Sequence, residues 1–536
     1  MRGTHQAMHH RLRSAVRRTV VFLLVSAPLR AQSTGDWEFV GPPGISAGQA
    51  VCAQIRCGPD GNPLVIYQDQ TGAGGHAVVQ RFDGAGWSSV GTPGQASLGD
   101  AWYNPLRFDD AGNLYFACRD YQVGGNLSVR RFALGGSAWT SVGPNAASSS
   151  QAHYTALEIG PGGMPYVAYA DRGTTPRDQP SVARFDSTTG QWQYLGPRGI
   201  TGAPSSYNTI AFDSQSVLYT CFSDRNQLDP VGAAKGTVMR WDEANASWSN
   251  VGAPGFTPTA VANLTLAIDH HDHLYIAYYR YHDSLIVMRF DGANWVQVGG
   301  SASGSDRPEV ESEGWRQWLS LCFDSQDRPY IAYELFDFGQ KAAVRCFDGT
   351  NWQQVGTHGF SPDVADYLSL TIDTFDVPQV VFVDASQNRK VSVMRYAPSP
   401  AVFGVPSPNT LGCTAAISAS GRPSLSSGQP FRIELSQVGN QRAGMLLWSG
   451  APAQIPFESG TLYVRPPLHR AGPLASGGNV GVHDCSGNFA YDFNLLLATG
   501  NTGLAPGTYG FAQYWYRDGN AGNSALSAGL RFRIEP

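Results

Sequence analysis

The amino-acid sequence predicts an all-β protein with two domains. Three observations support this: a motif recurs about every fifty residues, apolar and polar residues alternate within each repeat, and turn-forming residues are frequent, with 62 Gly and 34 Pro in 536 residues. Hydrophobic residues make up 42% and charged residues 15% of the chain. That composition supports a large core and excludes a disordered, highly charged protein.

The recurring motif is a tryptophan followed three residues later by Val-Gly or Leu-Gly. Its copies begin at Trp37, Trp87, Trp139, Trp192, Trp248, Trp295 and Trp352, at spacings of 50, 52, 53, 56, 47 and 57 residues. Within a repeat, residues 264–269 and 274–278 alternate as two strands, and an Asp-Gly turn then joins residues 287–290 to the Trp strand. Four antiparallel strands per repeat predict the blades of a β-propeller.

The ends of the repeat region indicate how the ring closes. Trp37 has no partner strand before it, and the last hairpin strand, residues 391–396, has no clear Trp strand after it. Pairing these two strands would complete a seven-bladed β-propeller over residues 37–396 and leave no exposed edge. The alternative is an open seam, with the degenerate segment 401–404 as the missing strand.

The repeat pattern resembles that of a known group of propellers. Trp-x-x-Val-Gly, Leu-x-Ile-Asp, Pro-Tyr-Val-Ala-Tyr-x-Asp and Val-x-Arg-Phe-Asp-Gly are similar to repeats common in exported proteins of environmental bacteria. The resemblance covers residues 37–396. It implies a fold and a compartment, and no activity.

The remaining chain predicts a second domain. A Pro-rich linker, residues 397–409, precedes short alternating segments within 410–536 that predict a small immunoglobulin-like β-sandwich. Residues 513–518 and 524–532 resemble a terminal domain of exported planctomycete-type proteins, which implies surface attachment or sorting. Cys413 and Cys485 are the two cysteines of this domain and are predicted to form a disulfide, because export leads to an oxidising compartment.

The N-terminus predicts export. Residues 1–31 carry six arginines before the first acidic residue, Asp36, and an apolar stretch at 19–29 that is too short to span a bilayer. We interpret 1–31 as a signal peptide and expect a secreted or cell-surface monomer with no transmembrane segment after cleavage. No basic run remains, so nucleic acid is not an expected partner.

Two sets of residues recur at equivalent positions and are the candidate ligand-binding residues. The aromatic set lies on the innermost strand at Tyr103, Tyr154, Tyr207, Trp318 and Tyr367, with Cys52 and Asn263 in the other two repeats. The carboxylate set follows the second strand at Asp69, Asp120, Asp171, Asp224 and Asp384.

Both sets are expected on one rim of the central channel. Aromatic faces cover sugar C–H surfaces and carboxylates accept hydroxyl hydrogen bonds, so the rim favours non-catalytic binding of an extracellular glycan, with a protein as the competing partner. The structural alternative has the tyrosines packing between blades and the aspartates accepting backbone N–H bonds in their own loops.

The competing function is catalytic. His153, beside Tyr154, interrupts the regularity of the repeats, and His76 lies on the corresponding loop of the first repeat. A His/Tyr pair near an arginine could act on a uronate chain, which makes a polysaccharide lyase or a glycoside hydrolase the alternative.

No cofactor is expected, and the sequence predicts no metal site. Residues 269–273 read Asp-His-His-Asp-His, but they occupy a tight turn in which adjacent side chains diverge. A calcium site is the weaker alternative, although no dense Asp-x-Asp-x-Asp loop is present.

Overall fold

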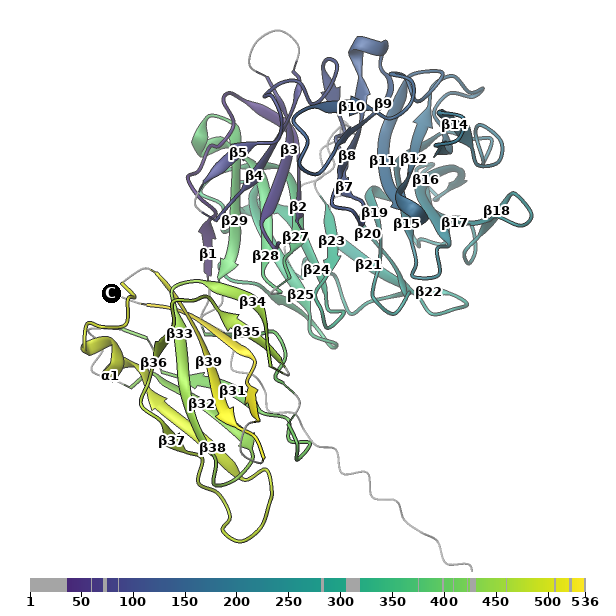
Figure 1. Ribbon diagram of the computed structural model, residues 1–536. Coiled ribbons are helices and arrows are strands. Elements are labelled where there is room, and N and C mark those ends of the chain that lie inside the picture. The colour runs from purple at the N-terminus through teal and green to yellow at the C-terminus, as the bar shows by residue number, and fades with distance from the viewer. Residues whose placement is uncertain are drawn as a thin grey trace, which may run out of the picture. The chain divides into compact units, whose positions relative to one another are not determined.

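The computed structural model describes residues 36–536 except 59, 71–74, 85, 281–283, 305–318, 375, 398–399, 408, 422, 425–429, 459, 506–507, 520–522 and 535–536. The expected signal peptide, residues 1–31, lies outside these residues. The regular secondary structure of the described chain is almost wholly β-strand, which confirms the all-β prediction (Figure 1). None of its helices is long and apolar enough to cross a lipid bilayer.

Within the described residues of the repeat region, the strands form seven small antiparallel sheets, which we call blades 1 to 7. Blades 1 to 3 are β2(Ala50–Cys57), β3(Pro63–Asp69), β4(Ala77–Phe82), β5(Trp87–Ser89); β6(Ala101–Trp102), β7(Leu106–Phe108), β8(Leu114–Asp120), β9(Asn126–Phe132), β10(Trp139–Ser141); and β11(Ala152–Gly160), β12(Met164–Asp171), β13(Gln179–Asp186), β14(Gln191–Tyr194).

The later blades repeat this order of strands. Blades 4 to 7 are β15(Ser205–Phe212), β16(Leu218–Leu228), β17(Ala234–Asp242), β18(Ser247–Asn250); β19(Ala262–Ile268), β20(Leu274–Arg280), β21(Ser284–Phe290), β22(Trp295–Gln297); β23(Ser320–Phe323), β24(Pro329–Leu335), β25(Lys341–Phe347), β26(Trp352–Gln354); and β27(Ala365–Ile372), β28(Pro378–Asp384), β29(Lys390–Ala397), β1(Asp36–Phe39). Short 3-10 turns are η1(Tyr121–Val123), η2(Pro161–Gly163), η3(Phe336–Phe338) and η4(Ala385–Gln387).

The first strands of the blades contact one another in a closed cycle. The contacts run from β2 to β7, β11, β15, β19, β23 and β27, and from β27 back to β2. The N-terminal strand β1 pairs with β29 in the antiparallel direction, with Trp37 opposite Tyr396 (Figure 1). The pairing expected between the first Trp strand and the last hairpin is therefore present, and the segment Ala401–Phe403 (β30) pairs instead with the C-terminal strand β41(Gly529–Arg533).

The tryptophan motif joins each blade to the one before it. The indole Nε1 of Trp87 donates to the carbonyl oxygen of Val40 at 2.7 Å, and Trp37 closes the cycle by donating to Val355 at 2.8 Å. The other motif tryptophans, Trp139, Trp192, Trp248, Trp295 and Trp352, make the same bond to Val90, Val142, Leu195, Val251 and Val298. The Trp and Val of the motif are thus the two halves of one contact between blades.

The C-terminal region contains two main sheets that share one core. The larger sheet includes β30, β33(Ala443–Ser449), β36(His469–Arg470), β37(Leu474–Ala475), β39(Tyr509–Arg517), β40(Ser524–Leu526) and β41; the smaller includes β31(Ala416–Ser420), β32(Arg432–Val438) and β38(Gly487–Asp492). β34(Pro452–Phe457) pairs with β35(Gly460–Val464), and α1(Phe493–Ala498) follows β38. Side chains such as Ile433 and Phe532 from the two sheets meet in one hydrophobic cluster.

The eight cysteines comprise one disulfide pair, in the C-terminal region, and six that lie in the blades. Cys413 and Cys485 form a disulfide with Cα atoms 5.6 Å apart. The six others are not disulfide-bonded and lie on blade strands: Cys52, Cys57, Cys118, Cys221, Cys322 and Cys346. Burial raises the pKa of Cys346 to about 11, so this thiol stays protonated and unreactive.

Candidate functional site

The aromatic set occupies one conformational position in the described blades. Tyr103, Tyr154, Tyr207 and Tyr367 all have left-handed backbone, with φ between 48° and 75°, as do Cys52 and Asn263 at the same register. The pairing of first and second strands shifts at this point in blades 1, 3, 4, 5 and 7. The register found in the sequence is therefore a β-bulge, which bends the strand and redirects its side chain. Trp318 lies outside the described residues.

The tyrosine rings pack against each other between blades. The ring centroids of Tyr103 and Tyr154 are 5.7 Å apart, and those of Tyr154 and Tyr207 are 5.1 Å apart. Tyr103, Tyr207 and Tyr367 are buried, whereas Tyr154 is half-buried. Burial raises the pKa of Tyr103, Tyr154 and Tyr207, so all three phenols are protonated at neutral pH. The rings offer little free face to a sugar and match the packing alternative.

The carboxylate set is also buried. Asp69, Asp120, Asp171, Asp224 and Asp384 are at most 8% exposed, each at the end of, or within, its second strand. Asp120 accepts the backbone N–H of Gln122 at 2.9 Å, and the same bond joins Asp171 to Gly173, Asp224 to Asn226 and Asp384 to Ser386. These four carboxylates thus hold their own loops, as the structural alternative requires. Arg280 and Leu335 stand at this position in blades 5 and 6.

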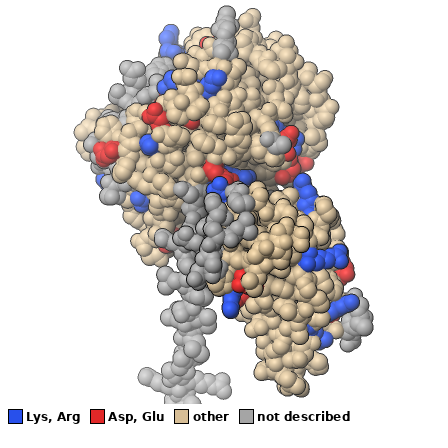
Figure 2. Space-filling view, turned by 90° about the vertical axis from the view of Figure 1, so that its left-hand side faces the viewer, with Lys and Arg blue, Asp and Glu red and all other residues tan. Residues whose placement is uncertain are grey.

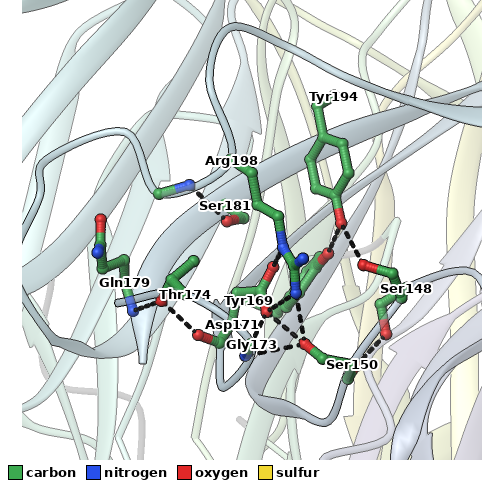
Figure 3. Close-up of polar contacts among 12 residues, drawn as sticks. Ser148, Ser150, Tyr169, Asp171, Gly173, Thr174, Gln179, Ser181, Tyr194 and Arg198 are labelled. Atoms are coloured by element: carbon green, nitrogen blue, oxygen red, sulfur yellow. Dashed lines mark hydrogen bonds and ion pairs between the residues drawn. The ribbon is translucent and has the colours of Figure 1, made fainter. Parts of the chain in front are cut away.

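Asp171 additionally binds an arginine from the loop after blade 3. Arg198 donates Nε to Oδ2 of Asp171 at 2.5 Å and Nη2 to Oδ1 at 2.8 Å, and Nη2 also reaches Ser150 Oγ at 2.8 Å (Figure 3). Tyr169 and Tyr194 share a hydrogen bond of 2.9 Å beside this pair. Burial alone would raise the pKa of Asp171, but the bonds from Arg198, Ser150 and Gly173 lower it below its ordinary value. This network is internally satisfied.

His153 differs from these groups because two arginines approach it. Its side chain is buried on β11, and Arg172 Nη1 lies 3.4 Å from its Nε2. Burial, followed by the charges of Arg119 and Arg172, lowers the pKa of His153 to about 4. The imidazole is therefore neutral at neutral pH. Since a guanidinium only donates, Nε2 presents its lone pair toward Arg172.

Arg119 is the cation of this group without a carboxylate partner. Its residue is 9% exposed, its Nε is buried with no hydrogen-bond partner, and Nη2 reaches only Gln151 Oε1, at 3.4 Å. No ion pair within the described part of the chain includes Arg119. By contrast, Arg172 lies 3.6 Å from Asp178. A buried guanidinium with an unused donor is costly unless an anion meets it.

Tyr121 provides exposed aromatic surface next to Arg119. The ring is 47% exposed, and the guanidinium carbon of Arg119 lies 4.8 Å from the ring centroid. Tyr121 follows Asp120 directly and begins the 3-10 turn η1. Arg119, Arg172 and Tyr121 were not among the sequence candidates, because no repeating register singles them out. The one sequence signal for this surface was Tyr121 itself, an aromatic residue directly after the recurring aspartate position at Asp120.

His76 belongs to a different contact. Its backbone pairs with that of Asp100 in an isolated antiparallel β-bridge, and it lines a pocket of about 310 Å³ together with Arg130 and Trp139. A second pocket, of about 520 Å³, lies between blades 4 and 5 and is lined by residues that include Tyr219, Arg240 and Arg289.

The histidine-rich turn between β19 and β20 is arranged differently from the sequence expectation. His270 and His271 do not diverge, because both contact Asp327, which comes from the equivalent turn of blade 6. Ligand atoms of Asp269, His271 and Asp327 lie within 4.8 Å of one another. Within one turn the side chains could not converge on an ion, but the next blade supplies the carboxylate of Asp327, which the sequence of a single repeat does not reveal.

No protein-family model matches the sequence, and no curated protein matches it. Among solved structures, the chain is similar to a fungal alcohol oxidase in complex with copper, at 12% identity and a TM-score of 0.46, over 94% of this chain and 100% of the other. It is similar to Trypanosoma rangeli sialidase in complex with sialic acid, at 11% identity and a TM-score of 0.38, over 94% and 96%. A third is Aleuria aurantia lectin with Fucα1-6GlcNAc, at 14% identity and a TM-score of 0.37, over 58% and 96%.

Proposed function

We propose that this chain is an exported β-propeller protein that binds an acidic extracellular glycan without cleaving it. In this proposal residues 37–396 are the seven-bladed binding domain, residues 397–409 the linker and residues 410–536 a sandwich that attaches or sorts the protein. The ligand class is a polysaccharide carrying carboxylate groups, such as a uronate chain.

The observation that carries the proposal is the state of Arg119. The residue is nine-tenths buried, and its guanidinium has an unused donor at Nε and forms no ion pair with a carboxylate among the described residues. A ligand carboxylate could accept from it in a charge-assisted hydrogen bond. Arg172 adds positive charge nearby, because both arginines lower the pKa of the same histidine, His153.

The neighbouring aromatic surface supports a sugar as the carrier of that carboxylate. Tyr121 is exposed beside Arg119, and a ring face covers the apolar C–H surface of a pyranose. The visible face in Figure 2 carries only scattered charged side chains (Figure 2). In this proposal the recognition element is a local arginine site rather than a broad charged face.

A uronate lyase is the second candidate, and the neutral state of His153 favours it. With Arg172 turned from His153 to the carboxylate of a bound uronate, the freed Nε2 lone pair of the neutral imidazole could remove the C5 proton. The C–H electrons would then form the C4–C5 double bond, the C4–O bond would break, and the leaving oxygen would take a proton from Tyr154. Burial raises the pKa of Tyr154, which keeps that proton available.

One experiment separates these functions. The full chain is tested against oligogalacturonate, alginate oligosaccharides and neutral cello-oligosaccharides, for binding and for unsaturated products that absorb in the ultraviolet. Selective binding of uronates with no product supports the proposal. A product that disappears in His153→Gln selects the lyase. Equal binding of neutral and acidic sugars, or binding of neither, overturns the proposal and leaves a protein ligand as the next candidate.

A further inference from the structure

Neighbouring blades are joined at the turns between their first and second strands. Ser214 of blade 4 donates its backbone N–H and its hydroxyl to Asp272 of blade 5, at 2.7 and 2.6 Å. Ser325 of blade 6 makes the same two bonds to Asp376 of blade 7, at 2.8 and 2.7 Å. The accepting aspartates have left-handed backbone, with φ of 65° and 59°. A serine-to-aspartate contact therefore recurs between blades.

The junction of blades 5 and 6 keeps this geometry and replaces the serine by histidines. His270 donates its backbone N–H to Oδ1 of Asp327 at 2.9 Å, and its Nδ1 lies 2.7 Å from the same oxygen. Nδ1 of His271 lies 2.5 Å from the other oxygen, Oδ2. Asp327 also has left-handed backbone, with φ of 56°. One carboxylate oxygen is thus fixed by the backbone and the other faces His271.

Asp269 completes the cluster from the start of the same turn. Its Oδ1 accepts the backbone N–H groups of His271 and His273 at 3.0 and 2.9 Å, and its Oδ2 lies 2.9 Å from Nδ1 of His273. Both carboxylates are therefore held by backbone N–H groups before any ligand binds. The side chain of His271 is 74% exposed, so solvent and ions reach the cluster.

We propose that Asp269, His271 and Asp327 bind one divalent transition-metal ion, with Zn²⁺ as the reference ion. One ligand atom from each lies within 4.8 Å of the others, which is the scale of a coordination sphere with bonds of about 2.0–2.2 Å. The metal would replace the hydrogen bond between His271 Nδ1 and Asp327 Oδ2. One imidazole and two carboxylates suit Zn²⁺, Ni²⁺ or Cu²⁺, whereas Ca²⁺ needs about six to eight oxygens.

The site has a structural consequence for the ring. His271 and Asp269 belong to blade 5 and Asp327 belongs to blade 6, so a bound ion would join two blades. His270 and His273 act as positioning residues, because each contacts one of the two carboxylates. We therefore expect the bound ion to raise the thermal midpoint of the protein.

The chain itself supplies the variant that tests this site. His270→Ser with His271→Gln converts residues 269–272 to Asp-Ser-Gln-Asp, which is the sequence of residues 324–327 at the next junction. This variant keeps a contact that already occurs in the fold and removes the imidazole ligand. The matched control is Asp376→Asn, which weakens the Ser325 junction and leaves the histidines intact.

The measurement is calorimetric titration of chelator-treated full chain with Zn²⁺, and separately with Ca²⁺, with thermal midpoints recorded in each case. We expect one Zn²⁺ per chain at this site and a rise of the midpoint on adding Zn²⁺, and Asp376→Asn should keep both the stoichiometry and the size of this rise. The double variant should weaken Zn²⁺ binding at least about tenfold. Should it fail to fold, His271→Ala takes its place. Equal Zn²⁺ binding by wild type and variant, or binding of Ca²⁺ alone, would overturn the site.

Discussion

The indole Nε1 of Trp248 donates a hydrogen bond of 2.8 Å to the carbonyl oxygen of Leu195, 53 residues earlier in the chain. Leu195 belongs to the preceding copy of the motif, which begins at Trp192, so the bond runs from blade 4 to the junction that follows blade 3. The ring of Trp248 also packs at 5.3 Å from that of Trp241 within its own blade. One side chain thus stabilises a blade and its neighbour.

Truncating this side chain should destabilise the ring. We expect Trp248→Ala to lower the free energy of unfolding by about 3–5 kcal/mol, because both the ring packing and the hydrogen bond are lost. Trp248→Phe keeps a ring and should lose about 1 kcal/mol for the bond. Chemical denaturation measures both. An unchanged midpoint in Trp248→Ala would show that the motif does not hold the blades together.

The glycine of the motif should be required by the next tryptophan as well as by its own backbone. Gly252 has φ of 76°, and a Cβ there would lie 3.1 Å from Cδ1 of Trp295. Gly202 has nearly the same φ, 74°, with nothing within 4 Å of its Cβ position. Gly252→Ala should therefore cost more than Gly202→Ala, which suffers only the left-handed strain of about 1–2 kcal/mol. Equal losses in denaturation would remove the close approach as a cause.

His153 should titrate far below an ordinary histidine. Burial and the charges of Arg119 and Arg172 lower its pKa to about 4. The folded-state pKa lies below the unfolded value of about 6.5, so protonation favours unfolding. The stability that the neutral ring contributes is therefore lost as the pH falls from about 6.5 toward 4. NMR titration of the imidazole measures the value. A pKa near 6.5 would mean that the ring is solvated and distant from both arginines.

Two aspartates at equivalent positions should respond to pH in opposite directions. Burial alone would raise the pKa of Asp171, but Arg198 and its other donors lower it, whereas burial raises the pKa of Asp224 despite bonds from Asn226 and Thr237. The contribution of Asp171 is therefore present above about pH 4 and is lost as the pH falls through its folded pKa, and that of Asp224 weakens as the pH rises.

We accordingly expect Asp171→Asn to cost more stability at pH 7 than at pH 3, and Asp224→Asn to cost less at pH 7 than at pH 3. Denaturant unfolding of both variants and the wild type at the two pH values gives the comparison. The same trend in both variants would contradict the assigned partners.

The strands and their pairing could be predicted from the sequence because each blade is specified by local patterns. Alternation defines the strands, an Asp-Gly turn such as 291–292 defines a hairpin, and the unpaired Trp37 strand indicates the closing partner. The common register of Tyr103, Tyr154 and Tyr207 was also visible. Its left-handed backbone was not, because φ at a bulge depends on the sheet rather than on the residue type.

The candidate site was less predictable because its contacts join loops of different blades. Arg198 reaches Asp171 across 27 residues, and His271 reaches Asp327 across 56. Arg119 was missed for a related reason: its distinguishing property is an absent partner, and a sequence pattern does not show which arginines are paired. The pattern within one repeat therefore predicts its strands well, but it does not predict which side chains of different repeats come together.

The most direct test of the account is calorimetric titration of a uronate oligosaccharide into wild type, Arg119→Ala and Arg184→Ala. Arg184 is the control because it lies on β13, the third strand of blade 3, and pairs with the exposed Glu243 at 2.8 Å. We predict that Arg119→Ala weakens binding at least about tenfold, the loss of one charge-assisted hydrogen bond, while its fold is retained and Arg184→Ala binds as wild type. Equal affinity in a folded Arg119→Ala would contradict the account.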